Sequence, residues 1–240
     1  MDAATRAELV TAIAVASEAD AKTRRKLARG LGHMAMQLEQ AGALEGVDDM
    51  DLALRALAMG AAAHSYPQRY LMSRARLMQR RRAALGLPEP SVAEEQAKAL
   101  DIEAGALFLA DADISPSQFI ADEPTHVTMQ RLGFFCVALG RDGIVKARLR
   151  VHEHGPCEPQ TSEFRRLREA TSVGRVLCKS GRVKVTGCGA KSIVLPARAI
   201  DYDIAAFGLG AGRSCECLLV LSPADGVASP VLTGTPELLL

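Results

Sequence analysis

The sequence predicts an α+β protein, an N-terminal helical bundle followed by a C-terminal antiparallel β-sandwich. Apolar residues recur at helical spacing up to about residue 87 and at alternate positions after residue 104. All six cysteines follow this change. With 240 residues, each half is long enough to bury a core of its own. We therefore expect a helical bundle at residues 1–87, a linker and short helix at 88–103, and a β-sandwich domain at 104–240.

Four helices are expected in the first segment. Thr5-x-x-Glu8 resembles a capping box that opens the first, and the fourth begins near Ser65 and ends before Gly86. Ser91-x-x-Glu94 is a similar motif, which predicts the short helix of the linker. The apolar faces of the second, third and fourth helices comprise Leu27, Leu31, Met34 and Leu38; Met50, Leu54, Leu57 and Ala61; and Tyr70, Leu71, Leu77 and Met78.

The composition and charge limit the classes of protein to which this chain can belong. The formal net charge of +1 argues against a strongly polyanion-binding protein. An apolar stretch at residues 9–16 is similar to the core of a secretion signal, but Asp2 and Glu8 place acid where a signal carries positive charge. No run reaches the roughly 20 apolar residues of a membrane span. Because six cysteines are too few for a disulfide scaffold, we expect a cytoplasmic protein.

In the second half, one strand is amphipathic. Its apolar positions Val145, Ala147, Leu149 and Val151 alternate with Lys146, Arg148 and Arg150, so one face is cationic. A tight turn at residues 141–143 predicts a hairpin between this strand and residues 134–139. Further strands are expected at residues 106–110, 183–186, 192–195, 202–207 and 215–221, and a helical patch at 163–170.

Three patterns are weak candidates for chemistry, each with a structural alternative. His152, His154, Cys157, Cys215 and Cys217 are residue types that bind zinc, but their spacing is not that of a zinc finger. Cys215 and Cys217 are in phase with Leu219 and Leu221, as expected of small hydrophobic residues packed in a strand. The glycines at residues 187–192 and 208–212 resemble nucleotide-binding loops, but strands follow them where a helix is required, which favours hairpin turns. We expect no cofactor.

Four acids, Asp111, Asp113, Asp122 and Glu123, could include the pair of carboxylates that a hydrolase uses. The alternative is that they are solvated residues of a surface loop. No nucleophile motif accompanies them. A hydrolase with a site here or near His152 and His154 therefore stays a rival hypothesis.

Charge is the better guide to function. The fourth helix carries only basic charge, and an acidic block precedes it, which indicates either ion pairs within the bundle or a partner-binding face. The arginines are Arg69, Arg74, Arg76, Arg80, Arg81 and Arg82; the acids are Glu39, Glu45, Asp48, Asp49 and Asp51. The strand residues Lys146, Arg148 and Arg150, with Arg182 and Lys184, would suit an acidic protein surface. A nucleic-acid-associated module using the arginine helix is the other rival, although aromatic residues are sparse.

The β-half carries five short motifs in a fixed order. They are Gly105-Ala-Leu-Phe-Leu-Ala-Asp111; Gly140-Arg-Asp-Gly143 with the strand after it; Ser180-Gly181-Arg182-Val183; Tyr202-Asp203-Ile204 with Phe207-Gly208-Leu209-Gly210; and residues 218–223. Over residues 104–225 this order resembles the domain shared by bacterial immunity-type proteins and the competence nuclease inhibitors. The resemblance implies a non-catalytic protein that binds and blocks a toxin or nuclease. We take Lys146, Arg148, Arg150, Arg182, Lys184, Arg74, Arg80 and Arg81 as the candidate partner-binding residues.

Overall fold

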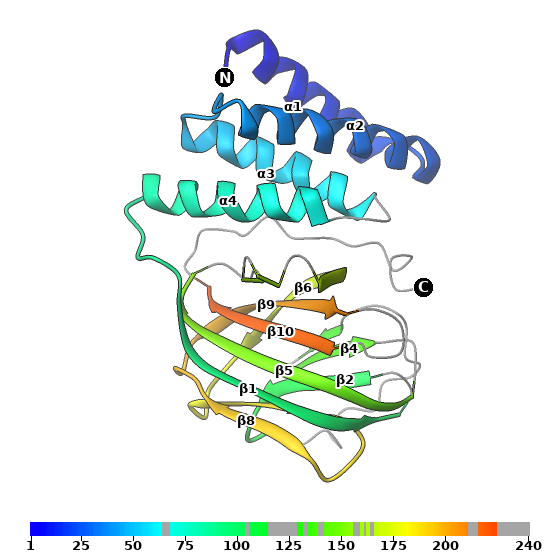
Figure 1. Cartoon of the computed structure of the whole chain (residues 1–240), viewed down its shortest axis with the longest axis vertical. Coiled ribbons are helices and arrows are strands. Elements are labelled where there is room, and N and C mark those ends of the chain that lie inside the picture. Colours follow the sequence, from blue (N-terminus) through cyan, green and yellow to red (C-terminus); the bar gives the residue numbers. More distant parts are fainter. Residues whose placement is uncertain are drawn as a thin grey trace. The chain divides into compact units, whose positions relative to one another are not determined.

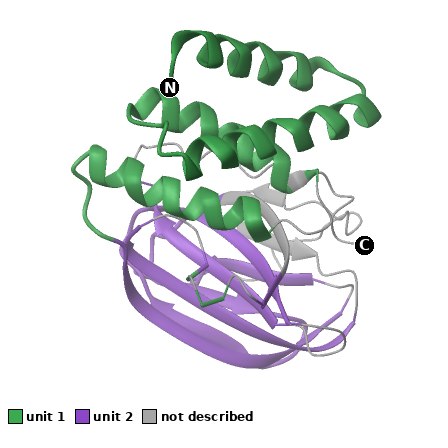
Figure 2. Cartoon of the chain, turned by 45° about the horizontal axis from the view of Figure 1, so that its top comes forward, with its two compact units in different colours: residues 1–89, 160–165, 230–233 green, residues 90–159, 166–229, 234–240 purple. Residues whose placement is uncertain are grey.

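The chain forms two compact units in the computed structural model (Figures 1 and 2). One comprises Met1–Glu89, Gln160–Arg165 and Pro230–Thr233, and the other comprises Pro90–Pro159, Arg166–Ser229 and Gly234–Leu240. The predicted α+β class is confirmed. The structure describes residues 1–63, 68–103, 106–114, 129–131, 134–138, 142–155, 159–160, 162–163, 166–210 and 216–224.

The first unit contains four helices among its described residues: α1 (Ala3–Glu18), α2 (Ala21–Gln40), α3 (Val47–Ala62) and α4 (Gln68–Ala84). The apolar faces predicted for α3 and α4 are buried as expected. In α2 the buried face is Ala28, Leu31, Gly32, Ala35 and Glu39, about one position from the predicted one. None of the described helices is both long and apolar enough to cross a membrane.

The cap of α1 differs from the prediction. Asp2, not Thr5, is the N-cap, and its carboxylate accepts a hydrogen bond from the Thr5 backbone N–H at 2.9 Å. The Thr5 hydroxyl also donates to this carboxylate, at 2.8 Å. These bonds lower the pKa of Asp2. An aspartate at this position satisfies a backbone donor that the first helical turn leaves unpaired.

Two glycines let α2 and α3 approach closely. A Cβ atom on Gly32 would lie 2.6 Å from the Gly60 Cα and 3.0 Å from a ring carbon of Tyr70, which is in α4. Real Cβ atoms do not make contacts this short, so either helix would have to shift to accept a side chain. The three helices therefore meet at a point that requires glycine.

We expect Gly32→Ala to lower the free energy of unfolding of the helical unit by about 1–3 kcal/mol, because the added methyl group overlaps the backbone of α3. Gly30→Ala is the matched control in the same helix: nothing lies within 4 Å of its Cβ position, so it should raise the stability by about 0.5–1 kcal/mol. Urea unfolding followed by helical circular dichroism measures both. Equal effects of the two substitutions would contradict the close approach.

The second unit is a pair of five-stranded sheets. Sheet A has the order β1 (Ser91–Ile102), β5 (Gly143–His154), β10 (Glu216–Pro223), β9 (Asp201–Leu209) and β6 (Leu167–Leu177). Sheet B has the order β3 (Met129–Arg131), β4 (Phe134–Ala138), β2 (Ala106–Asp111), β7 (Arg182–Thr186) and β8 (Ser192–Pro196).

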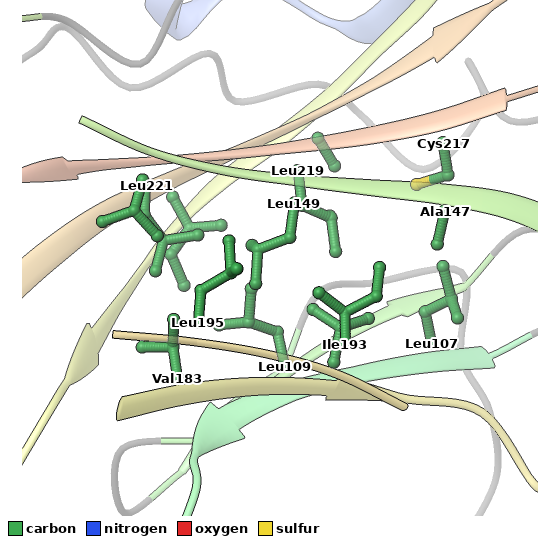
Figure 3. Close-up of a cluster of buried hydrophobic side chains, with 14 of the residues drawn as sticks. Leu107, Leu109, Ala147, Leu149, Val183, Ile193, Leu195, Cys217, Leu219 and Leu221 are labelled. Carbon is green, nitrogen blue, oxygen red and sulfur yellow. The ribbon is translucent and has the colours of Figure 1, made fainter. Parts of the chain in front are cut away.

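The core of this unit lies between the two sheets (Figure 3). Leu149 on β5 and Leu219 and Leu221 on β10 point toward Leu109, Val183 and Leu195 of sheet B. The predicted apolar face of β5 is entirely in this core, and so is the thiol of Cys217. Alternate residues of a strand point to opposite faces, so Lys146, Arg148 and Arg150 lie on the outer face of sheet A.

Four local predictions were wrong. Residues 91–102 form strand β1, which pairs with β5, although their Ala, Glu, Gln and Lys content favours a helix. Residues 167–170 belong to strand β6 rather than to a helix. Residues 134–138 pair with β2 and β3, so they are not the hairpin partner of β5. The sheets are not wholly antiparallel, because β10 runs parallel to β5.

Candidate partner-binding surface

Two glutamates on neighbouring strands pair with the basic residues of β5. We name these residues, Lys146, Arg148 and Arg150, the cationic stripe. Glu95 on β1 lies directly across from Arg150, and Glu216, the first residue of β10, lies across from Lys146. Arg150 Nε donates to Glu95 Oε2 at 2.5 Å, and Arg148 Nη1 lies 3.5 Å from Glu95 Oε1. The stripe is therefore an ion-pair network rather than a row of separate cations.

Glu216 gathers three cations, and we name Glu216, Lys146, Arg148 and Arg166 the Glu216 cluster. Arg148 Nε donates to Glu216 Oε1 at 2.5 Å, Arg166 Nη2 donates to Oε2 at 2.9 Å, and Lys146 Nζ lies 3.7 Å from Oε2. Arg166 is placed by its backbone carbonyl, which accepts from the Gly210 N–H at 2.7 Å just beyond β9. Three segments of the second unit thus meet at one carboxylate.

The carboxylate is buried while two of its partners are exposed. The Glu216 side chain is 3% exposed, whereas Lys146 is 59% and Arg166 is 50% exposed. Burial alone would raise the pKa of Glu216, but hydrogen bonds from Arg148 and Arg166 and the nearby charges outweigh it and hold the pKa below its ordinary value. Glu216 is therefore ionised at neutral pH, and the cluster retains positive charge at its exposed rim.

Sequence reasoning found the cations of β5 but missed Glu95, Arg166 and Glu216. Glu95 and Arg166 both lie in segments that were predicted to be helical, residues 91–100 and 163–170. Glu216 had a detectable signal, because it is the one charged residue in a strand that otherwise reads Cys-Leu-Leu-Val-Leu. A carboxylate in such a strand is rarely buried without a cationic partner.

The structure does not bring the other predicted binding residues to this cluster. Arg182 and Lys184 flank the core residue Val183 on β7, which places them on the outer face of sheet B. Arg182 lies 3.4 Å from Asp113. The candidates Arg74, Arg80 and Arg81 belong to α4 in the other unit.

Two arginines of α4, Arg76 and Arg81, pair with the acidic block, which confirms the first of the two interpretations for them. Arg76 donates twice to Glu39, at 3.0 and 2.7 Å, and this pairing lowers the pKa of Glu39. Arg81 pairs with Asp51, and Arg80 donates to the Leu44 carbonyl at 2.8 Å. Asp49 accepts from Arg6 and from the N-terminal amino group. These contacts favour a structural role for the arginine helix over nucleic-acid binding.

Asp111 has a structural role in the β-unit. Its carboxylate accepts backbone N–H bonds from Asp113 at 3.0 Å, from Ser180 at 2.7 Å and from Lys179. Burial would raise the pKa of Asp111, but these backbone donors outweigh it and lower the pKa. The carboxylate thus fixes the turn before β7. Asp122 and Glu123 lie outside the described residues.

The metal candidates are separated where they can be placed. Cys217 faces the core, whereas His152, which follows the core residue Val151, lies on the other face of sheet A. Among the residues that the structure describes, no three His, Cys, Asp or Glu side chains come together as a metal site. Cys157 and Cys215 lie outside those residues.

The first glycine loop, residues 187–191, is the turn from β7 to β8, and it contacts β1 at Asp101. The Cys188 N–H donates to the Asp101 carbonyl at 3.0 Å. A Cβ on Gly187 would overlap that carbonyl oxygen and lie 2.9 Å from its carbon. The hairpin interpretation of this loop is confirmed, and glycine is required at residue 187 because β1 approaches it closely. In the second loop Gly210 follows β9 with φ 110°, and residues 211–212 lie outside the described chain.

Comparison with known proteins gives one structural match to report. No family model and no curated protein matches the chain. The crystal structure of ComJ, inhibitor of the DNA degrading activity of NucA, from Bacillus subtilis, matches with a TM-score of 0.45 and 9% identity. The match covers 57% of this chain and 100% of that chain. The matched structure is of an inhibitor of the kind that the motif order resembles.

Proposed function

We propose that this chain is a non-catalytic binding protein that neutralises a bacterial nuclease or toxin, and that its contact surface includes the Glu216 cluster. The observation that carries the proposal is the convergence of Lys146, Arg148 and Arg166 on one buried carboxylate. The order of motifs in the β-half supports the class of partner. Cytoplasmic location is part of the proposal and rests on the sparse cysteines.

The geometry suits recognition of an acidic protein surface. Glu216 holds the guanidinium groups of Arg148 and Arg166 in fixed positions, so less side-chain entropy is lost when a partner carboxylate binds them. Lys146 and Arg166 are about half exposed and can attract an acidic partner before contact. Fixed cations at an exposed rim favour fast and selective association.

The function is tested by co-expressing the tagged full-length chain with the product of each flanking gene in turn, because inhibitors are commonly encoded beside their targets. We expect one product to co-purify and its toxicity or nuclease activity to be suppressed. If neither product co-purifies and neither is suppressed, the proposed function is wrong.

The surface is tested separately with the captured partner. We expect Lys146→Glu combined with Arg166→Gln to lower the association rate about tenfold at physiological salt, with less effect on the dissociation rate, because exposed rim charges act mainly on encounter. Arg182→Glu on the outer face of sheet B is the matched control and should change the rate less than about twofold. Stopped-flow measurement of the association rate of both variants tests whether the partner binds at the Glu216 cluster. If only the Arg182 variant slows binding, the partner uses the opposite face.

A further inference from the structure

Strand β1 is a long exposed edge. It lies at the end of sheet A, where β5 is its neighbour, and it is 12 residues long. Every residue from 92 to 99 is exposed. Proteins commonly shorten, cover or interrupt edge strands, because their unpaired backbone groups can add another strand. An exposed edge of this length is a candidate interaction surface.

The backbone groups that face outward can be identified. Asp101 accepts a hydrogen bond from Cys188 in the β7–β8 turn, so its carbonyl points away from β5. In an antiparallel pair each residue directs its N–H and C=O to the same side. The β1–β5 register is regular from Glu94 to Ile102. Glu95, Ala97 and Ala99 therefore direct their backbone groups to the open edge, which the turn closes at Asp101.

The side chains along this edge are self-complementary. Glu94, Gln96 and Lys98 share one face of β1, and all three are exposed. Lys98 Nζ also donates to the backbone carbonyl of Ser192 on β8 at 3.0 Å, which holds the ammonium group beside the edge. If a second β1 lies antiparallel with the two Gln96 residues opposite each other, each Glu94 faces the Lys98 of the other copy. The outward-facing Glu95 then exchanges backbone hydrogen bonds with Ala97 of the other copy. Two opposed glutamine amides can also donate to and accept from each other.

We propose that two copies of this chain pair through β1, antiparallel and two-fold symmetric about Gln96, to form a homodimer with a continuous sheet. The charges select this register. Centring on Glu95 would oppose two carboxylates, and centring on Ala97 would leave Glu94 opposite Leu100. Gln96 is also close to the middle of the exposed stretch, as a symmetric pairing requires. This dimer uses the edge of the sheet and does not depend on the proposed function.

The charge pairs give the first test, sedimentation of the full-length chain from about 1 µM to about 1 mM. We expect a concentration-dependent dimer. Glu94→Lys or Lys98→Glu alone should raise its dissociation constant about tenfold, because each substitution opposes like charges at two symmetric positions. The combined variant restores opposite charges and should return to within about threefold of the wild type. A monomeric wild type throughout this range, or a dimer that the single substitutions do not weaken, overturns the proposal.

The backbone gives the second test. Ala97→Pro removes an outward N–H and leaves the inward hydrogen bonds to β5 in place, so it should abolish the dimer, while the control Ala97→Ser should retain it. Unchanged hydrogen exchange in β5 would show that β1 is still paired with it. A dimer that withstands the proline substitution overturns the proposal. If Ala97→Pro instead exposes β5, the charge variants alone decide.

Discussion

Gly187→Ala is expected to destabilise the β-unit by about 3 kcal/mol or more. A methyl group at this buried position would overlap the Asp101 carbonyl oxygen of β1, and backbone atoms cannot turn aside as a flexible side chain can. Overpacking in a rigid site typically costs about 1–3 kcal/mol and occasionally more. The shift that relieves the overlap would also break the hydrogen bond from Cys188 to Asp101.

Urea unfolding, with hydrogen exchange of β1 and β7 peptides as the local readout, measures this effect. Ala190→Gly is the matched control in the same turn and should cost less than about 1 kcal/mol, because Ala190 is exposed and only backbone freedom changes. A Gly187→Ala variant as stable as the control would mean that the turn does not contact β1 closely.

The stability of the Gly187→Ala variant also distinguishes a hairpin turn from a nucleotide-binding loop at residues 187–191. A phosphate-binding loop uses glycine so that its backbone can approach a ligand, and substitution would then impair binding more than folding. Here the group that approaches Gly187 is the backbone of β1. A loss of stability in the free protein is the outcome that the structure requires.

The sequence predicted which residues of the β-unit face its core better than it predicted which strands lie side by side. Alternation along β5 identified Val145 through Val151 as a core face because burial of one face is a local property of a strand. It did not identify β10 as the parallel neighbour of β5, because the two strands are more than 60 residues apart and no turn connects them directly. Pairing between distant strands leaves little trace in local patterns.

Strand β1 was not predicted from the sequence, and for this reason the predicted set of binding-surface residues was also incomplete. Residues 92–99 are exposed, so they show no apolar alternation, and their helix-favouring composition decided the assignment. With Glu95 placed in a helix, nothing in the sequence indicated that Arg150 has a carboxylate directly opposite it. Arg150 is 1% exposed in that ion pair, so of the predicted cationic stripe only Lys146 is largely exposed.

Asp111→Ala is expected to lower the free energy of unfolding of the β-unit by about 3 kcal/mol or more, because three backbone N–H groups lose their acceptor together. Asp111→Asn keeps one oxygen and should cost about half as much. Asp113→Asn is the matched control, because that carboxylate is 69% exposed and its contact with Arg182 is long, so the change should stay within about 0.5 kcal/mol. Equal effects at the two aspartates would contradict the structural role of Asp111.

The same substitution predicts a pH dependence with a definite sign. The pKa of Asp111 in the folded state lies below its ordinary value of 3.8, because backbone donors favour the ionised form. The stability that this carboxylate contributes is therefore fully present above about pH 4, and it is lost as the pH falls through the folded-state pKa. Urea unfolding between pH 7 and about pH 2.5 should show the gap between wild type and Asp111→Asn narrowing only at the acidic end. A gap that stays constant to the lowest pH would mean that Asp111 is not held as a carboxylate, and the turn before β7 would then need another explanation.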